Sequence, residues 1–272
     1  MIICIDAGHY GRYNRSPGVK SYYESLQMWK LHELLEKELE AYGVEVITTR
    51  EDQTKDLALE KRGKMAKGCD LFISLHSNAV GSTMNESVDY PLACCSVSGE
   101  ADGIGLWLAQ SVARTMGTKQ SAQRTHRKLS SGKDYYGVLR GAAAVGVPGV
   151  LLEHSFHTNT KAANWLLSDS NLARLAKAEA AVIAEYYGLE KQTVTAEPEI
   201  NGFKPYCVKV ICSSLNIRKT PKWANSDVVG AIEKDGKKYT IIDETYLGST
   251  KFGKLKGGAG WISLGSGYVK KV

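Results

Sequence analysis

The sequence predicts an α/β protein whose mostly parallel, twisted sheet is flanked by helices on both faces, followed by a small all-β barrel. Strand and helix patterns alternate over the first 190 residues, which is the order that builds a covered parallel sheet. After Gly188 comes a stretch with two prolines, a glycine and few large apolar residues, which predicts a linker. From Tyr206 onward the apolar runs are short, and turn residues separate them at roughly ten-residue intervals, as in a small barrel. We therefore predict domains at 1–190 and 206–272, joined by a linker at 191–205.

Within the first domain, the strands are predicted from short apolar runs rich in β-branched residues. These runs cover residues 2–6, 44–49, 71–76, 87–97 and 148–153. The first helix is predicted over 24–42, because Met28, Leu31, Leu35 and Tyr42 fall on one helical face and Gly43 follows as a C-cap. Similar patterns predict further helices over 56–67, 101–116, 160–167 and 170–187. The polar, basic stretch 118–134 is predicted to be an exposed loop.

The composition is that of an ordinary globular protein, with 43% hydrophobic and 24% charged residues. No run of about 18 apolar residues is present, so no membrane insertion is expected. The first residues lack a basic segment and a cleavage site, which predicts synthesis in the cytoplasm without a signal peptide. The six cysteines form no metal-binding pattern and are predicted to be free thiols in a reducing compartment.

Positive charge is concentrated in the second domain. Residues 201–272 hold 13 lysines and arginines against 5 aspartates and glutamates, a net charge of +8, whereas residues 1–200 carry −2. Such a surface attracts anionic polymers, although it can also serve solubility alone.

Four residues of the first domain form a candidate catalytic set: His9, Glu24, His76 and Glu153. Both histidines and Glu153 stand where apolar strand runs end, and Glu24 opens the first long helix, which are the places where α/β enzymes hold their chemistry. Two imidazoles and a carboxylate match an open catalytic zinc site, and a second carboxylate can move protons. Each residue alone has a simpler explanation, since Glu24 suits a helix N-terminus and single histidines are commonly structural. Only the combination indicates Zn²⁺.

The order of these motifs resembles the zinc-dependent N-acetylmuramoyl-L-alanine amidases of the amidase-3 family, from residue 2 to about residue 187. The resemblance is carried by I-D-A-G-H, the glutamate fifteen residues later, T-R at 49–50, Arg62, D-L-F-I-S-L-H-S-N and V-P-G-V-L-L-E-H-S-F-H-T-N. It implies that His9, Glu24 and His76 bind zinc, that Glu153 is the catalytic carboxylate, and that the amide between N-acetylmuramic acid and L-alanine is cleaved. One departure is D-A-G-H-Y-G in place of the family's frequent D-P-G-H-G-G, which puts the bulk of Tyr10 beside the site.

Three further residues of the first domain are candidates for contact with substrate: Asn78, His154 and His157. Asn78 follows His76 closely, so that it either contacts substrate or supports that histidine. The two histidines flank Phe156 in E-H-S-F-H-T-N, where they either line the substrate groove or hydrogen-bond locally.

The second domain resembles bacterial SH3-type wall-binding modules through L-N-I-R-K-T-P at 215–221 and the terminal G-W-I-S-L-G-S-G-Y-V-K. The resemblance implies an SH3-like barrel that binds the cell wall, with anionic wall polymers as further partners of its basic surface. No nucleic-acid-binding motif is present, so nucleic acid is not an expected partner.

These predictions combine into a peptidoglycan hydrolase, a phage or prophage endolysin that acts on the wall after release or non-classical export. A bacterial autolysin is the close variant. The alternative from another class is a non-enzymatic wall-binding protein with a degenerate hydrolase domain, against which the four chemical residues argue.

Overall fold

The computed structural model describes residues 1–191 and 203–272, and most of the predicted linker at 191–205 lies outside the described residues. The chain divides into two compact units, Met1–Gln192 and Thr193–Val272. Among the described residues, none of the helices combines the length and the apolar character needed to cross a bilayer. All six cysteines, which lie in the described ranges, are free thiols, as the sequence predicts.

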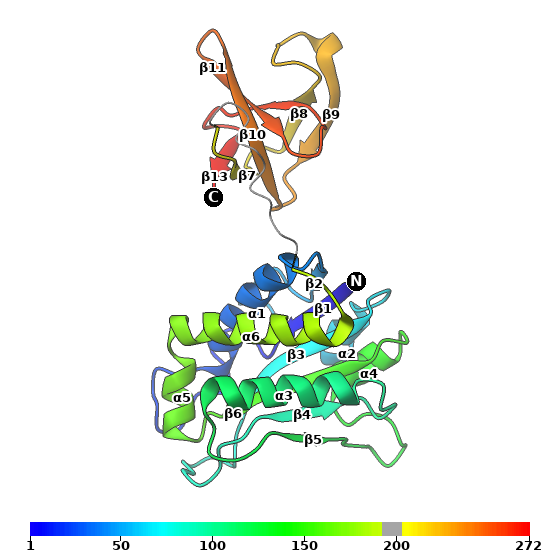
Figure 1. The fold of residues 1–272 in the computed structure, drawn as a ribbon, viewed down its shortest axis with the longest axis vertical. Helices are drawn as coiled ribbons and strands as arrows, with labels where there is room; N and C mark the ends of the chain where they lie inside the picture. The colour runs from blue at the N-terminus through cyan, green and yellow to red at the C-terminus, as the bar shows by residue number, and fades with distance from the viewer. Residues whose placement is uncertain (192–202) are drawn as a thin grey trace. The chain divides into compact units, whose positions relative to one another are not determined.

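The first unit is built on a six-stranded sheet with the strand order β2-β1-β3-β6-β4-β5 (Figure 1). The four strands β2, β1, β3 and β6 run parallel, β4 lies antiparallel to β6, and β5 runs parallel to β4. The predicted mostly parallel sheet is therefore confirmed. Its strands are β1 (Ile2–Ala7), β2 (Glu45–Thr48), β3 (Leu71–Asn78), β4 (Leu92–Cys95), β5 (Gln123–Thr125) and β6 (Gly149–Phe156).

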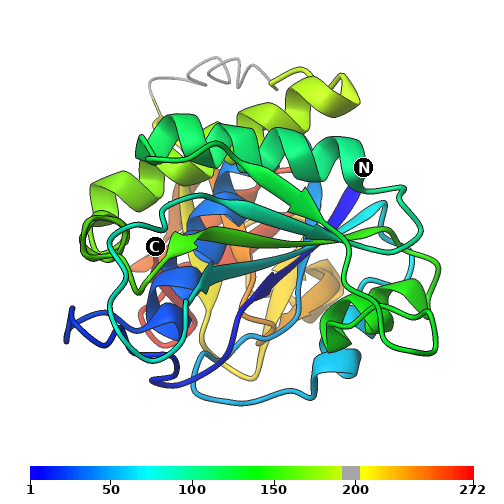
Figure 2. The same cartoon turned by 90° about the horizontal axis from the view of Figure 1, so that it is seen from below.

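Helices cover both faces of this sheet, as predicted. The long helices α1, α3 and α6 pack on one face and the short helices α2 and α4 on the other (Figures 1 and 2). The helices are α1 (Glu24–Glu40), α2 (Leu59–Lys64), α3 (Asp102–Met116), α4 (Gly137–Ala143), α5 (Thr160–Leu166) and α6 (Asp169–Tyr187). The first face has the larger apolar core, because three long amphipathic helices bury their apolar sides there.

Alternation along the strands decides which side chains face which helices. In β3, Leu71, Ile73 and Leu75 belong to the core under the long helices, whereas Phe72 belongs to the core under α2 and α4. The same period of two carries His76, at the end of β3, to the face of the short helices. In β6 the period likewise places Glu153 on that face, since Leu151 belongs to the same core.

Two elements of the first unit differ from the sequence-based expectation. The stretch 118–134, predicted to be a loop, contains the edge strand β5, whose polar Q-R-T residues show no apolar alternation. Helix α4 was not predicted, because seven residues of G-V-L-R-G-A-A are too short to display an amphipathic period. It packs against α2 at glycines: a Cβ on Gly63 would lie 2.0 Å from the Val138 carbonyl, and one on Gly141 would lie 2.3 Å from the Glu60 carbonyl.

The second unit is all-β, as predicted, and its strands pair antiparallel in the order β13-β7-β10-β11-β12-β8-β9. A core of eight buried aliphatic residues lies inside it. This arrangement is compatible with an SH3-like domain. Its strands are β7 (Tyr206–Val210), β8 (Ser214–Arg218), β9 (Val228–Glu233), β10 (Lys238–Leu247), β11 (Thr250–Leu255), β12 (Trp261–Ser263) and β13 (Val269–Lys271), with a 3-10 turn at Asn225–Asp227.

Candidate metal centre

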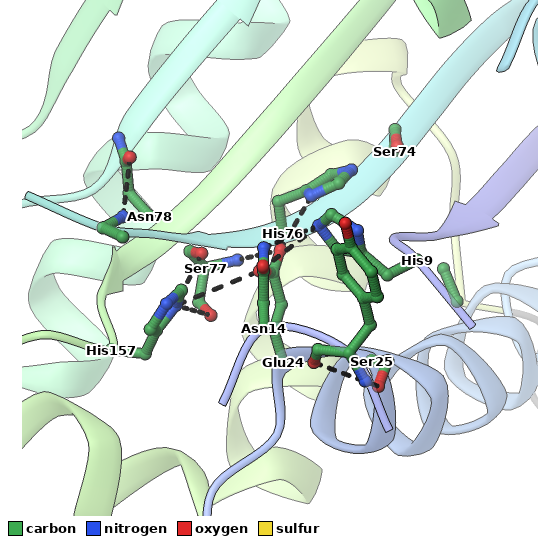
Figure 3. A network of polar contacts seen from close by, with 12 residues as sticks. His9, Asn14, Glu24, Ser25, Ser74, His76, Ser77, Asn78 and His157 are labelled. Carbon is green, nitrogen blue, oxygen red and sulfur yellow. Dashed lines mark hydrogen bonds and ion pairs between the residues drawn. The ribbon is translucent and has the colours of Figure 1, made fainter. Parts of the chain in front are cut away.

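Three of the predicted site residues converge at the carboxyl ends of β1 and β3. His9 follows β1, His76 lies near the end of β3, and Glu24 is the first residue of α1. One nitrogen of each imidazole and one oxygen of the carboxylate all lie within 4.8 Å of one another. Figure 3 shows the three side chains pointing toward a common centre. Two nitrogen donors and one carboxylate in this arrangement form the donor set of an open zinc site.

The Glu24 carboxylate is the buried centre of this group. Its Oε1 lies 2.7 Å from His76 Nδ1 and accepts a hydrogen bond from the Ser77 backbone N–H at 3.1 Å. Its Oε2 lies 3.4 Å from His9 Nε2 and accepts a hydrogen bond of 2.7 Å from the Asn14 side-chain amide. Burial alone would raise the pKa of Glu24, but the bonds to His76 and His9 outweigh it and hold the pKa below its usual range. Glu24 is therefore a buried anion, which suits it to bind a cation.

The backbone before His9 approaches β3 closely. The Gly8 N–H donates to the Leu75 carbonyl at 2.9 Å, and a Cβ on Gly8 would lie 2.5 Å from His76 Cε1. His9 itself has a φ of 58°, in the left-handed region that a residue with a side chain rarely adopts. Such strain persists where surrounding contacts enforce it, and it commonly marks functional positions. The imidazoles of His9 and His76 can lie this close together only because residue 8 is a glycine without a side chain.

Buried polar contacts hold the end of β1 in place. Asp6 is fully buried and accepts hydrogen bonds from the hydroxyls of Thr49 at 2.6 Å and Ser74 at 2.8 Å. Arg62, also buried, lies 3.5 Å from Asp6 and donates to the His9 carbonyl at 3.4 Å. The charge of Arg62 is thus compensated by Asp6 while its guanidinium holds the segment that carries His9.

Glu153, on β6, lies directly opposite His76 in the strand register. It is only 8% exposed, and its Oε2 atom is buried without any hydrogen-bond partner. Burial raises the pKa of Glu153 well above its usual range, and the negative charge of Glu24 adds to the effect. Two buried carboxylates that repel one another, one of them with an oxygen that has no hydrogen-bond partner, suit a site that binds a cation. The residues present therefore fit a divalent metal ion.

The metal-centre residues open into a cavity of about 340 Å³. Its lining comes from the strand ends, from the loop before α1 and the first residues of α1 and α2, and from residues before and within α4. The lining includes His9, Asn14, Glu24, Leu59, His76, Asn78, Tyr136, Val138, Glu153 and His157. Both the candidate metal ligands and the second carboxylate are therefore accessible to one substrate.

A comparison with known protein families identifies the family of the chain. A family model described as N-acetylmuramoyl-L-alanine amidase, Amidase_3, matches residues 3–185, which include all four residues of the catalytic set. The chain belongs to this amidase family. A comparison with curated proteins gave no match.

Several solved structures, two of them titled N-acetylmuramoyl-L-alanine amidases, share the fold of the first unit. The catalytic domain of CwlV from Bacillus (Paenibacillus) polymyxa var. colistinus is 23% identical with a TM-score of 0.57, over 70% of this chain and 99% of that one. AmiC2 of Nostoc punctiforme is 21% identical with a TM-score of 0.58, over 69% and 97%. Cwp6 from Clostridium difficile is 24% identical with a TM-score of 0.57, but the match covers 68% of this chain and only 29% of Cwp6.

In this amidase-family chain, the three residues predicted to contact substrate have different surroundings. Asn78 lines the cavity, and its Oδ1 accepts the Ala79 N–H at 2.8 Å. His157 also lines the cavity, but it is nearly buried and its Nδ1 lies 2.9 Å from the Ser77 carbonyl. Burial lowers the pKa of His157, which keeps its ring neutral near the metal-centre residues.

His154 requires a correction, because the structure places it away from the cavity. The residue is fully buried; its Nδ1 lies 2.8 Å from the His76 carbonyl and its Nε2 lies 2.8 Å from Glu179 Oε1. With both ring nitrogens engaged in the interior, His154 has no surface to offer a substrate. Of the two alternatives predicted for His154, the structure shows the local hydrogen bonds, which tie β3 and β6 to α6.

Asn14 and Tyr136 line the cavity but are not among the site residues predicted from the sequence. Asn14 bridges the site, with its side-chain amide 3.0 Å from His9 Nε2 as well as bonded to Glu24. Its φ of 49° and its place in the turn-rich N-R-S-P-G segment are the signals that mark such a residue. Tyr136 lines the opposite wall just before α4, an element that the sequence did not reveal.

Proposed function

We propose that the chain is a zinc-dependent hydrolase that cleaves the amide between N-acetylmuramic acid and L-alanine in bacterial peptidoglycan. One observation carries the proposal: in a chain of this family, His9, Glu24 and His76 present their donor atoms together in a cavity that also holds the unpartnered carboxylate of Glu153. A Lewis acid and a proton-transfer group at one opening are the two requirements of metal-assisted amide hydrolysis.

His9, Glu24 and His76 would hold the zinc ion. A bound zinc ion supplies a Lewis acid that polarises the scissile carbonyl and lowers the pKa of water. The buried Glu24 anion is already oriented by the Ser77 N–H and the Asn14 amide, so little ordering is needed when the ion binds.

Glu153 serves as the proton carrier. Its carboxylate takes a proton from the attacking water and returns it to the leaving alanine nitrogen, so that one group acts first as base and then as acid. A raised pKa suits this double role, because a carboxyl group whose pKa lies nearer to neutral pH can accept the proton of the water and keep it until the nitrogen leaves. His157 and Ser77 exclude water behind the site, since both are buried and bonded to one another.

The activity is tested by the fragments released from purified peptidoglycan. We expect the full chain with zinc to release free L-alanine amino groups and intact glycan strands, as identified by mass spectrometry. Removal of the ion by a chelator should abolish the release and lower the melting temperature, because an ion bound only by the folded chain stabilises it. Added zinc should restore both. Release of reducing sugars without alanine amines, or full activity in chelator, would contradict the proposal.

The second unit is proposed to be an SH3-like domain that holds the enzyme on the cell wall. Three observations support this proposal: the net positive charge of residues 201–272, the separate aliphatic core of the unit and its antiparallel sheet. A tethered catalytic unit gains a high local substrate concentration without new catalytic contacts. We further propose an endolysin-like role, in which the protein reaches the wall after release from the cytoplasm.

Retention on purified cell walls tests this role. The second unit, residues 201–272, should sediment with walls at low salt, and added salt should release part of it, because anionic wall polymers attract its lysines through screened charges. The matched sample is wall material from which the anionic polymers have been extracted, where binding should weaken. Equal partition with and without walls would show that the unit is no wall anchor.

A further inference from the structure

The cleft continues beyond the metal centre into a second arm. A cavity of about 380 Å³ adjoins the first one, and both are lined by His9, His76, Leu59 and Val138. The metal-centre histidines therefore stand between two arms of one cleft. An amide substrate has two parts, an acyl part and an amine part, and each needs its own arm on either side of the scissile bond.

The position of Glu153 assigns the arms, if the proposed amide hydrolysis holds. The group that protonates the leaving nitrogen has to lie on the amine side, within hydrogen-bond reach. Glu153 lines the first cavity and not the second. The peptide that departs with its alanine nitrogen thus occupies the first arm, and the muramoyl part, which carries the carbonyl, extends into the second.

Two exposed aromatic rings line the second arm. Tyr13 stacks on His9 with ring centroids 4.9 Å apart and an angle of 18°, and Tyr10 stacks on Tyr13 at 6.3 Å and 18°. Tyr10 is 38% exposed and Tyr13 51% exposed, and both line the second cavity. Large exposed rings held by stacking next to a reactive centre are typical of a binding surface.

A carboxylate faces the same arm. Asp56 lines the second cavity with its side chain 55% exposed, and its Oδ1 accepts a hydrogen bond of 2.8 Å from Arg62. The buried guanidinium fixes this acid, while its exposed part remains able to accept hydrogen bonds from hydroxyl groups. A pyranose ring has apolar C–H faces and hydroxyl edges, which match an aromatic surface beside a fixed acceptor.

We propose that Tyr10 and Tyr13 form the glycan subsite of this enzyme, in which the sugar ring next to the scissile amide packs against the tyrosine faces while its hydroxyls reach Asp56. Tyr10 is the specificity-determining member, because Tyr13 also contacts His9. The subsite would make the enzyme select amides attached to a sugar over the same amides in free peptides.

The subsite is tested with the full-length zinc protein and a peptide-free disaccharide of N-acetylglucosamine and N-acetylmuramic acid, titrated by NMR. Tyr10→Ala should weaken its binding about fivefold to tenfold, whereas Tyr10→Phe, which keeps the ring, should stay within about twofold of wild type. The binding of the free stem peptide should not change. The control variant is Tyr187→Ala, which removes an exposed tyrosine that contacts Tyr186 edge-on at the end of α6.

Three results would overturn the proposal: equal disaccharide affinity in wild type and Tyr10→Ala, a loss in Tyr10→Phe as large as in Tyr10→Ala, or a Tyr10→Ala protein that has lost its zinc. These results are distinct from a failure of the proposed amidase activity. If the wild type binds the disaccharide through Tyr10 but frees no alanine amines from peptidoglycan, the reaction is wrong and the glycan subsite stands.

Discussion

Replacing Glu153 by glutamine is expected to lower kcat by about 10²–10⁴-fold while the protein still binds zinc. Glutamine has nearly the same shape and keeps an oxygen in the cavity, but it can neither accept the proton of the attacking water nor hand it to the leaving nitrogen. The three candidate metal ligands are untouched, because Glu153 does not belong to their cluster. The measurements are single-turnover release of alanine amines and the zinc content of the purified variant.

Although Glu153→Gln lowers activity, it is not expected to destabilise the metal-free protein. Since burial and Glu24 raise the pKa of Glu153 in the folded chain, the metal-free wild type should lose stability as pH rises through and above the usual pKa of glutamate. Glu153→Gln removes this loss, so the metal-free variant should be at least as stable as wild type at pH 7. Thermal unfolding in chelator between pH 4 and pH 8 measures the difference. Near-normal turnover, or a variant that no longer binds zinc, would show that Glu153 is not the proton carrier.

The core of the first unit could be predicted from its sequence because its strands are buried on both faces. A run such as L-F-I-S-L has so many adjacent apolar side chains that it must lie in the interior, covered on both faces. The polar residue that ends each run therefore lies at the end of a strand. His76 and Glu153 were found for this reason. Chain order alone could not show that Glu24 reaches them, since that depends on how the preceding segment folds back over the end of β3.

The same alternation explains why His154 hydrogen-bonds in the interior and does not line the cavity. Consecutive residues of a strand point to opposite faces, so that if Glu153 faces the cavity, His154 must face the long helices. Its partner Glu179 lies on α6, where it is one of three acidic residues, with Asp169 and Glu185, and the sequence does not show that it is the buried one. Asn14 and α4 were missed for another reason: turns and short small-residue helices carry no period, and their positions follow from packing that the sequence does not display.

Replacing Gly8 by alanine is expected to disrupt the metal centre without unfolding the sheet. The new Cβ would lie 2.5 Å from His76 Cε1, 2.7 Å from His76 Nδ1 and 2.7 Å from the Leu75 carbonyl oxygen. The carbonyl belongs to the hydrogen-bonded backbone of β3 and cannot yield, so the segment that carries residue 8 and His9 has to shift, and the His76 ring has to turn away from Glu24. We expect zinc affinity to fall by at least about 10–100-fold, with a matching loss of activity at limiting zinc.

Gly11→Ala is the matched control, because it lies three residues further in the same loop. Gly11 has a φ of 56°, which alanine adopts only at some cost in free energy, but nothing lies within 4 Å of its added Cβ. The control should therefore lose about 1 kcal/mol of stability and keep its zinc, whereas Gly8→Ala should lose zinc and at least as much stability, because its new Cβ also meets the Leu75 backbone. Calorimetric zinc titration and thermal unfolding of both metal-free variants separate these effects. If both variants bind zinc as the wild type does, the approach of residue 8 to His76 is not what holds the two imidazoles together.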